Sequence, residues 1–265
     1  MAEDNARVSV EIRDHVAHVT LTRADKMNAV DKDMLAAVIA AAHEVAASDA
    51  RAVVLSGAGK SFCAGLDVMS FAAMGQMKDS AWIMDRTEGD ANDFQAVAML
   101  WRALEIPVIA ALHGATFGAG LQIALGADIR IAAPEAKLAV MEMKWGLIPD
   151  MGGMALLPQL VRSDVLRLLT YTATPVEATQ AERWGLVTEI SEDPLARAQA
   201  LAAEIAGKGP NAICAAKRLV AYAESGASSA EVLLRESEEQ AALIGKPEQM
   251  EVVMANMQKR APVFK

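Results

Sequence analysis

Cysteines and aromatic residues are scarce in this sequence, and positive charges are outnumbered by negative ones. The two cysteines, Cys63 and Cys214, cannot form a disulfide framework and lack the spacing of metal ligands. The four histidines lie apart and form no catalytic or metal-binding group. A formal net charge of −9 argues against general binding to nucleic acids or anionic membranes. We therefore expect no metal site, no nucleic-acid partner and no membrane partner.

The sequence also lacks long apolar runs, and we expect no secretory signal. Its longest apolar stretches are interrupted by glycine, proline or charged residues and are too short to cross a membrane. The N-terminal residues carry acidic and basic side chains from Glu3 to Asp14, which a signal peptide would not contain. We expect a cytoplasmic protein.

Short strands and helices alternate over the first two thirds of the chain. Alternating apolar residues predict a two-stranded hairpin over 7–21, and helical spacing predicts a helix over 31–45 with Asp31 as its N-cap. An apolar strand over 51–57 completes a strand–helix–strand unit, which implies a parallel pair. Further predicted elements are a helix over 93–104, strands over 107–112, 128–132 and 187–190, and two short helices within 163–184. The segment 69–93 has no clear periodicity, and we interpret it as mobile, partly helical and lying over the functional site.

The last third of the chain is almost wholly helical by pattern. Helices are predicted over 195–206, 211–224, 229–244 and 247–259. Strands in the first part and helices at the end predict an α/β core followed by a helical region. We place the core, with the functional site, in residues 1–194. Residues 195–265 form a helical region that we expect to pack subunits together.

Two glycine-rich turns each follow an apolar strand. The first contains Cys63-Ala64-Gly65 and the second contains Gly118-Ala119-Gly120. Small residues let a ligand approach the backbone closely, and two backbone N–H groups directed at one oxygen make an oxyanion hole. Parallel sheets bind ligands beyond the carboxyl ends of their strands, where both turns are expected.

These segments resemble the crotonase superfamily, the enoyl-CoA hydratase/isomerase family. The stretch SFCAGLDV, residues 61–68, resembles the family's first oxyanion segment, and HGATFGAGLQIALGADIRIA, residues 113–132, resembles the second. The resemblance covers nearly the whole chain. It implies a crotonase-like ββα spiral with two near-perpendicular sheets and a C-terminal helical region. It also implies that the N–H groups of Ala64 and Ala119 hold the thioester oxygen.

The acidic residues depart from the pattern of the family's hydratases. Gln122 stands where hydratases carry a catalytic glutamate, and a neutral amide cannot act as a general base. Glu142 matches the family's other glutamate, and its apolar neighbours predict a raised carboxyl pKa. Asp150 matches an aspartate of dienoyl-CoA isomerases and the nucleophile position of chlorobenzoyl-CoA dehalogenases. Asp150 could instead be only a helix N-cap, and Gln122 could be a structural amide.

The resemblance also implies a coenzyme A site. Lys26 and Met27, together with the turn around Asp67, match the loops that hold the adenine and pantetheine. Lys259 and Phe264 match a basic and an aromatic residue that reach the coenzyme A of a neighbouring subunit. The full set of expected substrate-binding residues is Lys26, Met27, Ala64, Gly65, Leu66, Asp67, Gly118, Gln122, Lys259 and Phe264.

The sequence therefore predicts an enzyme that acts on acyl-CoA thioesters through an enolate. Our first choice is an isomerase that shifts a carbon–carbon double bond, with Glu142 as the proton carrier and Asp150 as a secondary one. Hydration of a 2-enoyl-CoA and non-catalytic acyl-CoA binding are the alternatives, and Gln122→Glu is expected to raise hydration. No cofactor is expected beyond the coenzyme A of the substrate. Family members assemble as homotrimers or as dimers of trimers, and we expect one of these states.

Overall fold

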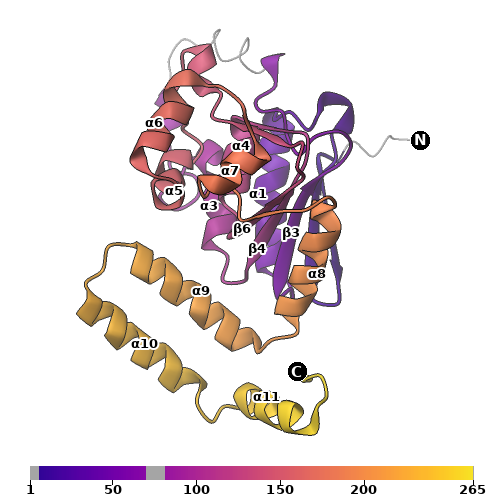
Figure 1. Cartoon of the computed structure of the whole chain (residues 1–265), viewed down its shortest axis with the longest axis vertical. Helices are drawn as coiled ribbons and strands as arrows, with labels where there is room; N and C mark the ends of the chain where they lie inside the picture. Colours follow the sequence, from indigo (N-terminus) through magenta and orange to yellow (C-terminus); the bar gives the residue numbers. More distant parts are fainter. Residues whose placement is uncertain (1–5, 70–80, 265) are drawn as a thin grey trace.

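Parallel strands make up most of the main sheet of this protein. The computed structural model describes residues 6–69 and 81–264. The sheet is six-stranded in the order β1-β2-β3-β4-β6-β9. Figure 1 shows β6, β4 and β3 side by side within it. Only β1 and β2 pair in antiparallel fashion, as the predicted hairpin, and the other pairs within this sheet are parallel. The strands are β1 (Val8–Arg13), β2 (Val16–Leu21), β3 (Ala52–Gly57), β4 (Val108–Leu112), β6 (Ile129–Ala132) and β9 (Glu189–Ile190).

Helices cover both faces of this sheet because β3 and β4 are apolar on both sides. Along β3, Val53 and Leu55 point into a large core beneath α1 (Lys32–Ala46) and α3 (Asp93–Ala103). Val54 points the opposite way, as the two-residue period of a strand requires, and packs against α8 (Pro194–Ala206). Asp31 caps α1 by accepting the Met34 N–H at 2.8 Å, so the predicted N-cap is confirmed.

A second, three-stranded sheet agrees with the two sheets that the family resemblance implies, although its individual strands were not predicted from the sequence. It has the order β5-β7-β8, with β5 (Ala115–Phe117), β7 (Lys137–Ala139) and β8 (Val176–Glu177). These strands are two or three residues long, too short for a recognisable alternation. The sheet brings the segment after β4 beside the segment after β3, because Cys63 pairs with Thr116 of β5 in an isolated bridge.

Short helices connect these strands. They are η1 (Ala24–Lys26), η2 (Ala81–Met84), α4 (Ala119–Leu125), η3 (Glu142–Trp145), α5 (Gly153–Leu160), α6 (Ser163–Thr172) and α7 (Ala178–Arg183). The two short helices predicted within 163–184 are α6 and α7. Of the segment 69–93, residues 70–80 lie outside the described residues.

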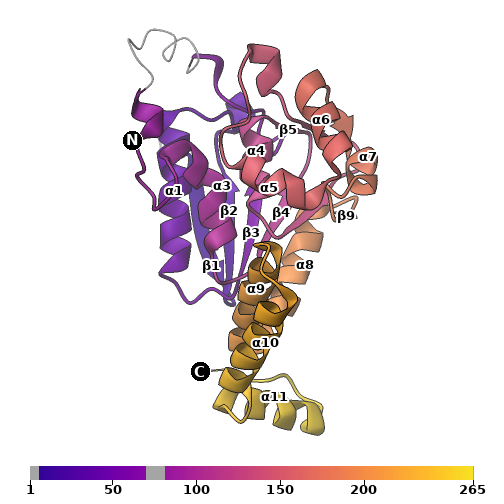
Figure 2. The ribbon, with the colours of Figure 1, turned by 90° about the vertical axis from the view of Figure 1, so that its left-hand side faces the viewer.

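The C-terminal helices form an arm that extends away from the sheets (Figure 2). It consists of α9 (Pro210–Glu224), α10 (Ser229–Leu243) and α11 (Pro247–Gln258), and α9 packs against α10 as a hairpin. Helix α9 is attached to the core through an ion pair of 2.8 Å between Lys217 and Asp128. The division at residue 194 stays a prediction, although α8 packs on the main sheet and belongs with the core. Among the described helices none is long and apolar enough to cross a membrane.

Candidate active site

A cavity of about 560 Å³ lies between the segments that follow β3 and β4. Its position agrees with the expectation that both glycine-rich turns bound one site. The first turn contributes Ala64, Gly65 and Leu66, and the second contributes Gly118 and Ala119. The other lining residues are Val68, Trp82, Ile83, Phe94, Met141, Glu142, Trp145, Leu147, Ile148, Asp150 and Met151.

The two turns are in direct backbone contact. The Cys63 N–H donates to the Ala115 carbonyl at 3.1 Å, and the Phe117 N–H donates to the Cys63 carbonyl at 3.0 Å. A Cβ at Gly120 would lie 2.4 Å from the Cys63 carbonyl oxygen, so a side chain there would force the turns apart. Glycine at this position therefore sets the distance between the two walls of the cavity.

The backbone donors differ from the expected pair at one position. Ala119 is the first residue of α4, so its N–H has no acceptor within the helix and remains available to a ligand. The Ala64 N–H, in contrast, already donates to the Met27 carbonyl at 2.9 Å and is not offered for the expected role. The Leu66 N–H makes no hydrogen bond to any described residue, and Leu66 lines the cavity. Leu66 therefore replaces Ala64 as the candidate donor of the first turn.

Glu142 presents one engaged and one free oxygen. Its Oε1 accepts a hydrogen bond of 2.6 Å from Nε2 of Gln122, while its buried Oε2 has no partner among the described residues. Burial raises the pKa of this carboxyl, and the nearby Asp150 raises it further. The direction and its cause, poor solvation of the carboxyl, were both predicted, although the chain neighbours Met143 and Trp145 are themselves partly exposed.

Asp150 is a cavity residue and does not cap a helix. The N-cap of α5 is Gly152, and no side chain caps this helix, so the N-cap alternative for Asp150 is wrong. Burial raises the pKa of the Asp150 carboxyl. No lysine, arginine or histidine is among the described residues that line the cavity. Both acids therefore face a ligand without a compensating cation.

Gln122 lies behind Glu142 and is only 2% exposed. Its Oε1 accepts the N–H groups of Met151 at 2.8 Å and Gly153 at 3.0 Å. The side chain does not line the cavity, so the structure supports the structural-amide interpretation of Gln122 over direct substrate binding.

An aromatic part of the wall was not predicted from the sequence. Trp82 of η2 and Phe94 of α3 line the cavity, and their ring centroids are 5.4 Å apart. The only available signal was the position of two of the chain's few aromatic residues just before and inside a predicted helix. Such a signal does not distinguish a site residue from a core residue.

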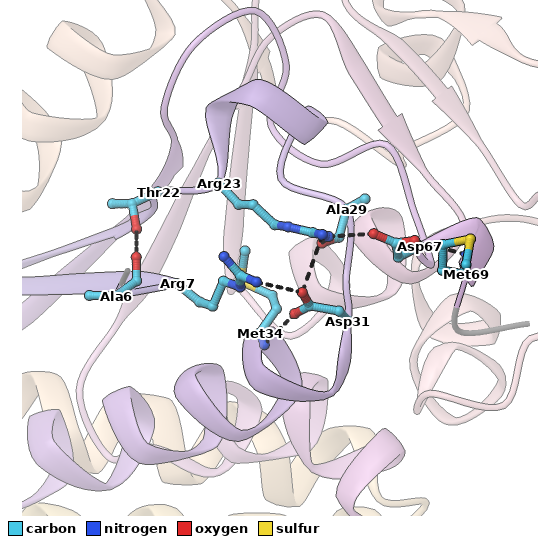
Figure 3. A network of polar contacts seen from close by, with 9 residues as sticks. All are labelled: Ala6, Arg7, Thr22, Arg23, Ala29, Asp31, Met34, Asp67 and Met69. Carbon is cyan, nitrogen blue, oxygen red and sulfur yellow. Dashed lines mark hydrogen bonds and ion pairs between the residues drawn. The ribbon is translucent and has the colours of Figure 1, made fainter. Parts of the chain in front are cut away.

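Asp67, one of the expected coenzyme A residues, belongs to a polar network outside the cavity (Figure 3). Arg23 pairs with Asp67 at 2.6 Å and with Asp31 at 3.3 Å, and Arg7 pairs with the same Asp31 at 2.8 Å. The Met69 N–H and then Arg23 hold the pKa of Asp67 below its usual value. The side chain of Asp67 is thus committed to the protein. Lys26, the last residue of η1 and the neighbour of Met27, lines a shallow cavity of about 430 Å³ beside Arg23 and Asp67.

The structure does not bring Lys259 and Phe264 to the cavity of their own chain. Lys259 ends α11, and the Phe264 ring lies under the Arg51 guanidinium at 5.4 Å. Arg51 precedes the first residue of β3, whereas the cavity lies beyond the last residue of that strand. These two residues are therefore at the opposite end of the main sheet.

The arrangement can hold an oxygen at backbone N–H groups and move a proton with a carboxylate. In the part of the chain that the structure describes, no group of three or more histidine, cysteine, aspartate or glutamate residues could hold a metal ion. Backbone N–H groups and carboxylates arranged in this way can provide anion stabilisation and acid–base catalysis.

Comparisons with known proteins agree with this chemistry. Residues 11–265 match the family described as enoyl-CoA hydratase/isomerase. The chain is 34% identical over 216 residues to the mitochondrial Delta(3,5)-Delta(2,4)-dienoyl-CoA isomerase of Homo sapiens, covering 78% of this chain and 66% of that protein. It is 31% identical over 215 residues to (E)-benzylidenesuccinyl-CoA hydratase of Thauera aromatica, covering 80% of each. The crystal structure of enoyl-CoA hydratase from Bacillus anthracis superposes with a TM-score of 0.87 at 27% identity, covering 98% of this chain and 99% of that one. The chain has the crotonase fold and belongs to the enoyl-CoA hydratase/isomerase family.

Proposed function

We propose that this enzyme shifts a carbon–carbon double bond in an enoyl-CoA thioester. The observation that carries the proposal is the carboxyl of Glu142, a residue that lines a largely apolar cavity and whose buried Oε2 has no hydrogen-bond partner among the described residues. A carboxylate in such surroundings has a raised pKa and is a stronger base than an exposed one.

The thioester oxygen would lie at the N–H groups of Leu66 and Ala119. Glu142 removes a proton from the acyl chain, and the electron pair moves onto this oxygen to give an enolate. The electrons then return to form the double bond at its new position, and Glu142 delivers the proton to another carbon of the chain. Losing one backbone donor in such a hole typically costs about 2.7–4 kcal/mol of transition-state stabilisation. Asp150 would assist as a second proton carrier.

Two further observations favour isomerisation over hydration. A hydratase must activate a water, and position 122 holds a neutral amide whose oxygen is engaged by two backbone N–H groups. The human relative is named a dienoyl-CoA isomerase. Hydration of a 2-enoyl-CoA is the alternative, since the Thauera aromatica relative is named a hydratase. In either reaction the coenzyme A belongs to the substrate, and we propose no separate cofactor.

The test is incubation with a panel of 2-enoyl-, 3-enoyl- and dienoyl-CoA esters, followed by mass and ultraviolet absorbance. An isomerase changes the absorbance at constant mass, whereas a hydratase adds the mass of one water. Faster hydration than isomerisation across the panel would overturn the assignment. Tight binding without any turnover would favour the non-catalytic alternative.

The C-terminal arm has the properties of a self-assembly surface, and we propose that the chain forms a homotrimer or a dimer of trimers. The arm exposes large apolar side chains that nothing in the described chain covers: Val220, Tyr222, Leu233, Leu234, Met250, Val253, Met254 and Met257. Assembly would allow Lys259 and Phe264 to reach the coenzyme A bound by a neighbouring subunit. Light scattering coupled to size-exclusion chromatography measures the state directly, and a monomer at micromolar concentration would contradict the proposal.

A further inference from the structure

Gln122 forms hydrogen bonds both to Glu142 and to the backbone that follows Asp150, although it does not line the cavity. Its Nε2 donates to Glu142 Oε1 at 2.6 Å, and its Oε1 accepts from the Met151 and Gly153 N–H groups. Residues 151–153 directly follow Asp150, so one side chain links the base to the turn that carries the second acid. At 2% exposure this amide is shielded from water that could replace its bonds.

We infer that Gln122 is the positioning residue of this site: it fixes the two oxygens of Glu142 in distinct roles and holds Asp150 beside them. The inference rests on the proposed function, because it concerns how the same base is oriented. Oε1 is held by the amide, so Oε2 is the oxygen left for the substrate proton. A carboxylate fixed by one oxygen cannot rotate to exchange them without breaking a buried hydrogen bond.

The neutral charge of the Gln122 amide also affects the pKa of Glu142. The amide donates to the charged form of Glu142 and therefore lowers its pKa, opposing part of the rise that burial produces. An arginine here would hold the carboxylate permanently charged and weaken it as a base, whereas an apolar residue would leave burial unopposed. The amide thus keeps Glu142 basic and still able to ionise.

This geometry changes the expectation for Gln122→Glu. The new carboxyl would keep one oxygen at the Met151 and Gly153 N–H groups, which require an acceptor. Its other oxygen would face Glu142 Oε1 at about the 2.6 Å now spanned by the amide. Two carboxylates at that distance share one proton, and the second ionisation moves to higher pH. The variant is therefore expected to shift the pH dependence of the site and not to become a hydratase.

Two variants separate the two roles of Gln122. Gln122→Glu preserves the bonds to the turn and changes only the partner of Glu142. Gln122→Met has a similar length but removes every bond. Ser56→Ala is the control, because Ser56 is also buried and hydrogen-bonded, yet lies in the main sheet beside Thr20, away from the cavity.

The first measurement is infrared titration of the carboxyl bands, with the Glu142 band identified by its loss in Glu142→Gln. This measurement needs no turnover. We expect the Glu142 transition to move up by about one pH unit or more in both Gln122 variants, and to stay in place in Ser56→Ala. An unmoved Glu142 transition in Gln122→Glu and Gln122→Met would overturn the inference.

The second measurement is the pH dependence of kcat/KM on the best substrate. In both variants, the pH at which kcat/KM falls on the acidic side should rise together with the Glu142 infrared transition. Only Gln122→Met should also lower the melting temperature. A lower melting temperature without any shift of that pH would mean that Gln122 is only structural and would overturn the inference. If the infrared transition moves but the wild type turns over no enoyl-CoA, the proposed function fails while the role of Gln122 in orienting Glu142 is supported.

Discussion

Two acidic clusters border the first glycine-rich turn, and the protein treats them in opposite ways. Outside the cavity, Asp31 and Asp67 each pair with Arg23, and Asp31 also pairs with Arg7. Inside the cavity, Glu142 has a neutral amide as its partner. The pKa of Asp67 is accordingly lowered, and that of Glu142 is raised. The carboxylates that pair with an arginine stay charged and hold two loops together. The carboxylate that is hydrogen-bonded to a neutral amide, in a largely apolar cavity, can take up and release a proton.

Because the two pKa values shift in opposite directions, Asp67 and Glu142 make the stability of the fold depend on pH with opposite signs. Asp67 stabilises the fold at pH values above its ordinary pKa of 3.8, and this stability is lost as the pH falls through its lowered folded pKa. Glu142 behaves in the reverse manner. Its raised pKa favours the folded state below the ordinary value of 4.5, and that contribution is lost as the pH rises through the folded pKa. The cavity acid therefore lowers stability at neutral pH, in exchange for basicity.

Glu142→Gln should give the largest effect. The substitution keeps the shape and removes the base, so turnover is expected to fall by about 10²–10⁴-fold. The melting temperature at pH 7 should stay the same or rise, because a buried charge is removed. Steady-state kinetics and thermal unfolding measure both quantities, with Glu135→Gln, at an exposed position, as a matched control. Full turnover in Glu142→Gln, together with an inactive Asp150→Asn, would reverse the two roles.

Arg23→Met should give the next largest effect, and on stability instead of chemistry. It leaves Asp31 and Asp67 without their shared cation, and hydrogen bonds to charged groups are typically worth about 1.5–3 kcal/mol. We expect a loss of about that size in the free energy of unfolding at pH 7, measured with urea, and a smaller loss near pH 3. Arg23→Lys is the control that keeps the charge and loses the planar fork. An unchanged stability in Arg23→Met would mean that this network is not structural.

Asp150→Asn should give the smallest of the three effects. We expect a rate loss of about tenfold, below the range usual for a principal acid–base group. Because Gly152, and not Asp150, is the N-cap of α5, the melting temperature at pH 7 should not fall. Kinetics and thermal unfolding under the conditions used for Glu142→Gln allow direct comparison. A drop in melting temperature would show that Asp150 has a structural task after all.

The sequence was sufficient to predict those elements that depend on interactions between residues close together in the chain. The hairpin, the capped helix α1 and the parallel pair β2–β3 follow from apolar spacing and a single N-cap residue. The direction of the pKa shift of Glu142 could be predicted from its apolar neighbours, but its hydrogen bond from Gln122, 20 residues away, could not. The role of Leu66 could not be read, because it depends on the Met27 carbonyl occupying the Ala64 N–H. Gln122 could be identified as neutral, but not as the link between two acids, because its partners lie 20 to 31 residues away.

The contact between the two glycine-rich turns also gives the protein a built-in reporter of opening. Cys63 is fully buried in that contact, its Sγ donates to the Asn28 carbonyl at 3.0 Å, and burial raises the pKa of its thiol to about 12. Thiolates, not thiols, react with alkylating reagents, so this sulfur becomes reactive only when the turns separate. Cys214 is not fully buried and serves as the internal reference on the same chain. The ratio of the two alkylation rates would report how often the two turns separate, without introducing any new residue into the protein.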